Sequence, residues 1–88
     1  MMIKNIKFSI EPEIQEKILY KHGIKIEELR SALEDGKPKI RRVRDNIYIA
    51  VTHYLRYITV YFEYEQGKGK VTTAYPSQEW QIGMYHKK

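Results

Sequence analysis

Residues 47–75 read IYIAVTHYLRYITVYFEYEQGKGKVTTAY, and this stretch decides the fold. Apolar and polar residues alternate along it with a period of two, which is typical of strands. Leu55-Arg56 and Gly67-Lys68-Gly69 interrupt the alternation as short turns. Consecutive strands joined by short turns pair antiparallel, so the pattern predicts a meander. The predicted strands cover residues 47–54, 57–65 and 70–75.

The flanking segments extend the predicted sheet. The basic run at residues 39–44 precedes the turn residues Asp45-Asn46 and predicts a fourth strand of the meander. Residues 3–10 alternate loosely and predict a separate N-terminal strand. Side chains alternate between the two faces of a strand, so each strand has a core set and an outward set. In the strand over 57–65 we expect Ile58, Val60, Phe62 and Tyr64 to face inward and Tyr57, Thr59, Tyr61 and Glu63 to face outward. In the strand before it, Ile47, Ile49 and Val51 share one face.

Two short helices are predicted before the meander. Glu11-Pro12-Glu13 begins the first, because proline lacks an N–H that would be unpaired there and carboxylates favour the positive end of the helix dipole. Lys21-His22-Gly23 ends it with basic residues and a glycine suited to a left-handed cap. A second helix is predicted over residues 24–33, ending before Gly36. The expected apolar stripes are Ile14, Ile18 and Leu19 in the first helix, and Ile26, Leu29, Ala32 and Leu33 in the second.

A last short helix is predicted after Pro76. Ser77 is expected to cap this helix, and Trp80 is expected to pack it onto the sheet. The whole pattern predicts one domain over residues 1–88 of the α+β class. We expect its helices on one face of an antiparallel sheet, with the other face partly open to solvent.

The composition favours an anionic partner. The 88 residues carry a formal net charge of +5, and many of the eight tyrosines alternate with arginine and lysine in the second half. Aromatic rings can stack on bases while cations contact phosphates, so nucleic acid is one such partner and an acidic protein surface is another. The sequence has no cysteine, which is compatible with a reducing compartment, and no apolar run approaches the ~20 residues of a membrane span. We therefore expect a cytoplasmic protein that does not bind a membrane.

Cleavage of RNA is the chemistry that these residues suit best. The 2′-hydroxyl is the nucleophile, so a protein must align it, move protons and stabilise the charged phosphorane. The candidate catalytic residues are His22, His53, Arg56 and Tyr75. The candidate nucleic-acid contacts are Arg41, Arg42, Arg44, Tyr61, Lys68 and Lys70. The three histidines lack metal-ligand spacing, so the predicted reaction needs neither metal nor cofactor.

Each candidate has a structural alternative that the sequence leaves open. His22 can complement the helix dipole, and His53 can be an ordinary half-buried histidine. Arg56 can be a solvated turn residue, and Tyr75 can serve packing alone. The arginines of residues 39–44 can simply protect an edge strand from aggregation.

Several segments, taken in order, resemble the BrnT-like toxins of type II toxin–antitoxin systems, in the RelE/ParE-type ribonuclease superfamily. Together they span most of residues 8–80. The matching segments are Lys21-His22-Gly23-Ile24, Glu27-Glu28-Leu29, Ala32-Leu33, Leu55-Arg56-Tyr57-Ile58-Thr59-Val60-Tyr61-Phe62-Glu63-Tyr64 and Val71-Thr72-Thr73-Ala74.

The resemblance implies a RelE-like fold and a toxin that cleaves messenger RNA and is neutralised by a cognate antitoxin. By position it implies that His22 and Arg56 are active-site residues. The family usually has arginine where this chain has Tyr75, which removes a permanent cation. A non-catalytic RelE-like module that binds nucleic acid or a protein through its basic, tyrosine-rich sheet is the alternative. Action on the ribosome and a homo-oligomeric state stay open.

Overall fold

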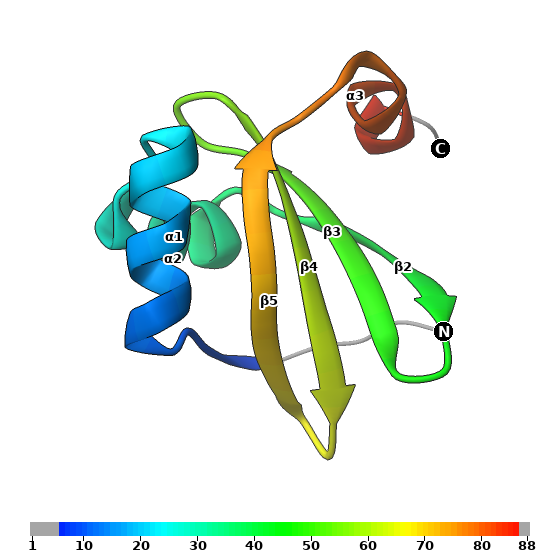
Figure 1. Ribbon diagram of the computed structural model, residues 1–88. Coiled ribbons are helices and arrows are strands. Elements are labelled where there is room, and N and C mark those ends of the chain that lie inside the picture. Colours follow the sequence, from blue (N-terminus) through cyan, green and yellow to red (C-terminus); the bar gives the residue numbers. More distant parts are fainter. Residues whose placement is uncertain (1–5, 87–88) are drawn as a thin grey trace.

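The computed structural model describes residues 6–86, which form a five-stranded sheet and three helices (Figure 1). In spatial order the strands run β1-β5-β4-β3-β2. The elements are β1 (Lys7–Ser9), α1 (Pro12–His22), α2 (Ile26–Asp35), β2 (Lys39–Arg44), β3 (Ile47–His53), β4 (Tyr57–Glu65), β5 (Lys68–Pro76) and α3 (Glu79–His86). Residues 3–5 of the predicted first strand lie outside the described residues.

The sheet contains the predicted four-stranded meander. Strands β2, β3, β4 and β5 pair antiparallel in sequence order, which confirms the prediction. Strand β1 adds to the free side of β5 in parallel, but it pairs only with residues 68–70. Beyond that point α1 packs beside β5 (Figure 1). The second half of β5 therefore lies at the edge of the sheet, next to a helix.

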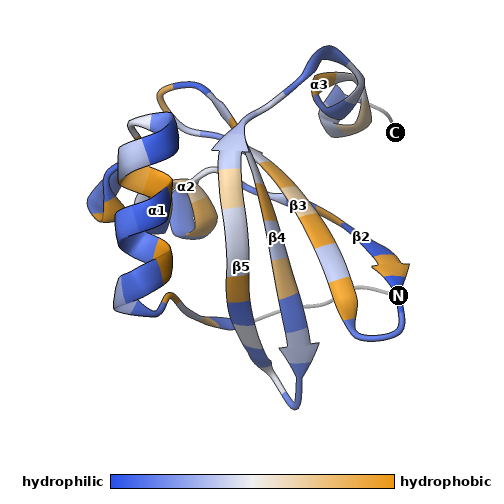
Figure 2. Cartoon of the chain, viewed as in Figure 1, coloured by the Kyte–Doolittle hydropathy of each residue, from blue (hydrophilic) through white to orange (hydrophobic). Residues whose placement is uncertain are grey.

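The hydrophobic core lies between the sheet and the pair α1 and α2. Figure 2 shows apolar bands on the strands and on these helices, whereas the β4–β5 turn is hydrophilic. Phe62 is fully buried at the centre, with the ring of Phe8 5.1 Å away edge-on and the ring of Tyr48 stacked 5.8 Å away. The other buried members are Ile10, Ile18, Ile24, Leu29, Ala32, Leu33, Ala50, Ile58, Val60, Val71 and Ala74.

Helix α1 ends as the sequence predicts. Gly23 has φ 67°, in the left-handed region, and its N–H donates to the carbonyl of Leu19 over 2.9 Å. Ile18 is buried, but the expected third member of the stripe, Leu19, is 50% exposed. That expectation was wrong because the side of α1 that faces the sheet is narrow and is covered by Ile14 and Ile18.

The second face of the sheet is also covered in part, by α3. Tyr85 packs on Tyr57, and Gln81 bonds to Tyr75; Tyr57 and Tyr75 both belong to the set that faces away from α1 and α2. The prediction that all helices lie on one face was therefore wrong for α3 (Figure 1). On this face Thr59 is fully buried although it belongs to the predicted outward set.

The pairing of β3 with β4 shows which side chains of β3 face the helices α1 and α2. Ala50 lies opposite Val60, so Ala50 faces α1 and α2, and Thr52 on the same side donates a 2.6 Å hydrogen bond to the carbonyl of Ala32. Ile49 and Val51 lie on the other face and are still buried. Both faces of β3 are thus covered.

Helix α3 docks through a polar side chain. Trp80 is 58% exposed, so the expectation that it packs this helix onto the sheet was wrong; Gln81 is fully buried instead. Ser77 does not cap the helix, since its hydroxyl bonds to that of Thr59 over 2.7 Å. The N–H of Gln78 donates to the Gln81 side chain over 2.8 Å and so supplies the first-turn contact. Within residues 6–86, no helix is both long and apolar enough to cross a membrane.

Candidate functional site

His22 and Tyr75 meet at the open edge of β5. The left-handed cap at Gly23 ends α1 at His22, and α1 packs beside β5, where Tyr75 lies one residue before the end of the strand. The two ring centroids are 5.9 Å apart, with the planes inclined by 49°. Both side chains are half-buried, so one part of each ring remains accessible to a ligand.

Tyr61 extends this pair across the sheet. It lies on β4, on the same face as Tyr75, because Tyr61 pairs with Thr73 and Thr59 pairs with Tyr75. The rings of Tyr61 and Tyr75 are 6.2 Å apart and inclined by 32°, within the range of aromatic pairs. His22, Tyr75 and Tyr61 therefore form a continuous row of rings, which we call the aromatic row.

Gln81 holds Tyr75, the middle ring of the aromatic row, through a hydrogen bond. Its side-chain amide donates to the hydroxyl of Tyr75 over 2.8 Å, while its carbonyl oxygen accepts from the backbone of Gln78. Burial, and then the neighbouring Tyr75 hydroxyl, raise the pKa of Tyr61 above its ordinary value of 10.0. Tyr61 is thus a neutral hydroxyl at physiological pH, suited to stacking and to hydrogen bonding.

Arg56 joins the β3–β4 turn to the connection between α1 and α2. Its guanidinium donates to both carboxylate oxygens of Glu28, over 2.9 and 3.1 Å, and to the carbonyl of Gly23 over 3.1 Å. The hydrogen bonds that Arg56 donates to the Glu28 carboxylate raise the pKa of Arg56, and burial opposes this effect. The Arg56 side chain is 40% exposed. Arg56 therefore holds the residue next to His22, but its charge is already paired with a carboxylate.

His53 belongs to a second cluster. Its ring lies 4.5 Å from that of Tyr57, and the Tyr57 hydroxyl is 2.7 Å from Nε2 of His86. His53 is two strands and two pairing rows away from Tyr75, a Cα separation of roughly 12 Å from strand spacing and rise. The structure thus brings His22 together with Tyr75 and places His53 with α3.

The predicted phosphate contacts lie in three places. Arg41 shares a face and a pairing row with Tyr61, two strands away at the β2 edge. Arg42 donates to the carbonyl of Asp45 over 2.8 Å. Lys70 forms a 2.9 Å ion pair with Glu11, which raises the pKa of Lys70. Arg44 and Lys68 are also at the end of the sheet remote from His22.

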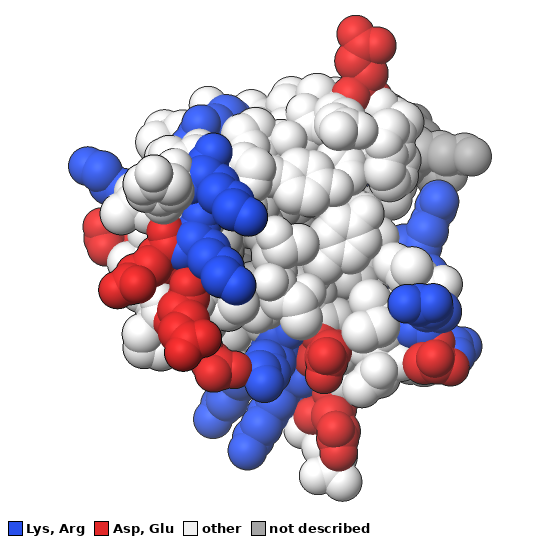
Figure 3. Space-filling view, viewed as in Figure 1, with Lys and Arg blue, Asp and Glu red and all other residues white. Residues whose placement is uncertain are grey.

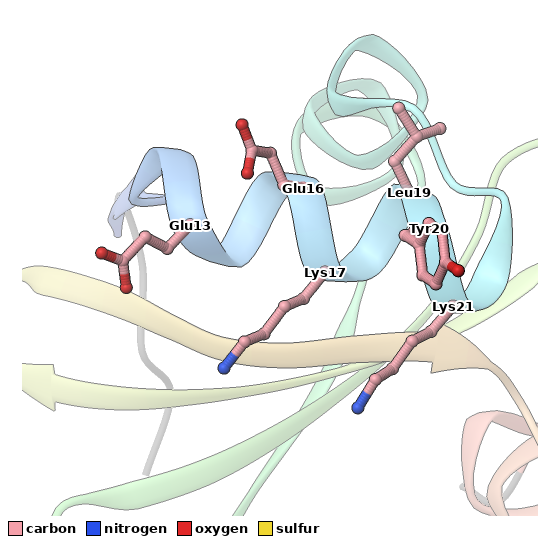
Figure 4. Close-up of a pocket in the computed structure, with 6 residues that line it drawn as sticks. All are labelled: Glu13, Glu16, Lys17, Leu19, Tyr20 and Lys21. Atoms are coloured by element: carbon pink, nitrogen blue, oxygen red, sulfur yellow. The ribbon is translucent and has the colours of Figure 1, made fainter.

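Two lysines that we did not single out from the sequence lie on α1, the helix that ends at His22. Lys17 and Lys21 project from the same side of α1 towards the sheet, whereas Glu16 and Leu19 point away from it (Figure 4). In Figure 3 basic groups over α1 border an uncharged surface over the neighbouring strands. The four-residue spacing of Lys17 and Lys21 places them on one side of a helix, and this pattern could have revealed the pair in the sequence. No local sequence pattern indicates that Gln81 packs against Tyr75.

In the part of the chain that the structure describes, no group of three or more His, Asp or Glu side chains is placed to hold a metal ion.

Comparisons with known proteins give a structural match. No protein-family model matches the sequence, and no curated protein matches it. The fold is similar to that of the Brucella abortus ribonuclease toxin BrnT, with a TM-score of 0.65 over 84% of this chain and 99% of that chain, at 15% sequence identity. The expected BrnT-like α+β fold is therefore confirmed.

Proposed function

We propose that this protein is a metal-independent endoribonuclease toxin that cleaves messenger RNA at the aromatic row. The observation that carries the proposal is the contact between His22, the residue type that most often transfers protons in catalysis, and Tyr75, a ring able to stack on a base. The fold it shares with a ribonuclease toxin supports the same conclusion.

In the proposed reaction the RNA 2′-oxygen attacks the adjacent phosphorus atom. The P–O5′ bond breaks, leaving a 2′,3′-cyclic phosphate and a 5′-hydroxyl. His22 accepts the proton of the 2′-hydroxyl, or donates a proton to the departing 5′-oxygen, with water supplying the other transfer. No bond to a protein atom and no external oxidant is needed.

The remaining side chains position the RNA. Tyr75 and Tyr61 stack on bases, and Gln81 holds Tyr75 through its hydroxyl. Arg56 is a positioning residue that fixes the turn carrying His22 through the Gly23 carbonyl. Since its guanidinium remains partly exposed, a phosphate can also approach it in competition with Glu28.

A cognate antitoxin is the proposed protein partner. The chain carries a net charge of +5, so an acidic antitoxin segment that covers the aromatic row would block RNA and complement the charge. The same proposal includes messenger RNA on the ribosome as a substrate and a homo-oligomer as an assembly of this chain.

The experiment is RNA degradation by the purified full chain in EDTA, beside the His22→Ala and His86→Ala variants. His86 is the matched control because it is a histidine in the other cluster. Cleavage that persists in EDTA and is lost only in His22→Ala supports the proposal. Failure of the wild type to cleave free and ribosome-bound RNA that it binds would favour instead the non-catalytic module, for which the pairing of Arg56 with Glu28 is the specific argument.

A further inference from the structure

The basic side of α1 has no role in the site as described so far. Lys17 and Lys21 lie one helical turn apart, which places their Cβ atoms about 5–6 Å from each other. Figure 4 shows both side chains extended from α1 towards the strands of the sheet. They therefore form a two-point basic border alongside β5.

Within residues 6–86, neither lysine forms an ion pair with a carboxylate. Glu13 precedes Lys17 by four residues, which is the favoured spacing for a helical ion pair. Between residues 6 and 86, however, the ion pairs are Arg56–Glu28 and Lys70–Glu11. Lys17 and Lys21 are both exposed, so their ammonium groups are available to an anionic ligand.

The surface beside the lysines is uncharged and aromatic. It contains Tyr75 and Tyr61, which are half-buried and lie on the face of the sheet turned away from α2. Figure 3 shows that the basic groups over α1 border an uncharged area over the neighbouring strands. Rings beside cations match a single nucleic-acid strand, whose bases are free to stack while its phosphates remain outside. A duplex would hide those bases and offer its grooves instead.

The other basic segment is less suited to act with these rings. Strand β2, whose Arg41 shares a face with Tyr61, lies two strands from that ring, about 10 Å, and three strands from Tyr75 on β5, about 14 Å. Arg42 on that strand is held by the carbonyl of Asp45. At the far end of β5, Lys70 is paired with Glu11.

We propose that α1 is the phosphate-binding side of the site: Lys17 and Lys21 contact neighbouring phosphates of single-stranded RNA whose bases stack on Tyr75 and Tyr61. This inference rests on the proposed function for the identity of the ligand as RNA, but not for its cleavage. The inference also gives the path of the RNA strand, which runs along α1 and the edge of β5 and passes His22.

The test is binding of a fluorescent, single-stranded 2′-O-methyl oligoribonucleotide, which cannot be cleaved because it lacks the 2′-hydroxyl. Anisotropy titrations at several salt concentrations compare the full-length wild type with the double variant Lys17→Gln/Lys21→Gln. The matched control is Lys7→Gln/Lys37→Gln, which removes two exposed lysines elsewhere. The α1 variant should bind about tenfold more weakly, and its slope of log K against log salt should fall by about 1.4, or ~0.7 for each lost phosphate contact. Lys17→Arg/Lys21→Arg should restore both.

Equal losses in the two double variants would overturn the inference, because they would reflect net charge alone. Equal affinity of the wild type for a duplex of the same sequence would also overturn it. Cleavage of ordinary RNA is measured in parallel. If binding depends on the two lysines but ordinary RNA is not cleaved, the inference holds and the ribonuclease proposal is rejected. If RNA is cleaved and Lys17→Gln/Lys21→Gln changes neither cleavage nor binding, the ribonuclease proposal holds and the inference is rejected.

Discussion

The ring of His22 lies 5.9 Å from the ring of Tyr75, although one ends a helix in the first third of the chain and the other nearly ends the last strand. The contact exists because β1 pairs with only the first residues of β5, so α1 can lie against the rest of that edge. A histidine and a tyrosine, both half-buried, are thereby held side by side at the edge of the sheet.

Substitution of His22 and of His53, both candidates from the sequence, should affect activity differently. His22→Ala should lower RNA cleavage on the order of 10²–10⁴-fold, the range for loss of a general acid or base. His53→Ala should change it by only a few-fold, because His53 packs on Tyr57 in the other cluster. Single-turnover cleavage assays on variants with matched circular dichroism spectra measure this difference. A larger loss in His53→Ala would move the site to α3.

Two substitutions of Tyr75 should separate the effect of base stacking from that of the hydrogen bond with Gln81. Tyr75→Phe keeps the ring but leaves the buried amide of Gln81 without its acceptor, which should cost about 1–3 kcal/mol of unfolding free energy. Tyr75→Ala should in addition weaken binding of single-stranded RNA by about 1–3 kcal/mol, the range for one stacked base. Urea unfolding and anisotropy titrations measure the two effects. Tyr20→Phe is the control, since Tyr20 is 92% exposed; an equal loss of stability in that variant would contradict the argument.

Glu28 tests what Arg56 does. If Arg56 acts by holding the turn at Gly23, then Glu28→Gln and Arg56→Gln should lower cleavage by similar factors. Each substitution breaks the Arg56–Glu28 pair, which keeps the guanidinium beside the Gly23 carbonyl. A double-mutant cycle on unfolding should give a coupling of about 0.5–1 kcal/mol, as expected for a partly exposed pair. Full activity in Glu28→Gln with none in Arg56→Gln would instead show that Arg56 contacts the RNA.

Two glycines should respond oppositely to the same substitution. A Cβ at Gly36 would overlap the Thr52 hydroxyl and the carbonyl oxygens of Ala32 and His53, whereas a Cβ at Gly83 meets nothing within 4 Å. Gly36→Ala should therefore destabilise the protein by about 1–3 kcal/mol. Gly83→Ala, inside α3, should stabilise it by up to about 1 kcal/mol through helix propensity. Denaturant midpoints at constant m-value measure the change in stability for both substitutions. An unchanged midpoint in Gly36→Ala would contradict the close packing of α2 on β3 at Gly36.

Tyr61 should titrate above the ordinary pKa of a tyrosine. Burial raises its pKa above 10.0, so the folded protein keeps this proton at a pH where the unfolded chain has lost it. The stabilisation is therefore complete below pH 10 and is lost as the pH rises through the folded pKa. The tyrosinate absorbance titration of the wild type should show a late phase that is missing in Tyr61→Phe. A late phase that survives this substitution would assign it to another residue.

The local elements of the fold could be read from the sequence. Alternation in residues 47–75, with short turns, is enough to determine the antiparallel meander, because strands joined so closely have no other way to pair. The end of α1 at Gly23 was equally readable, since a left-handed cap is a local requirement. His22 and Tyr75 were recognisable as candidates by residue type, and His22 also by its resemblance to a known family.

The tertiary structure alone decided which candidates meet. Periodicity shows that a strand has two different faces, but not which face a helix will cover; hence Trp80 points outward while Gln81 is buried against Tyr75. The partners of Arg56 and the side of α1 that borders β5 likewise depend on how helices pack across the sheet edge. Sequence determined the elements because their hydrogen bonds are local; packing determined the site because its contacts join residues far apart in the chain.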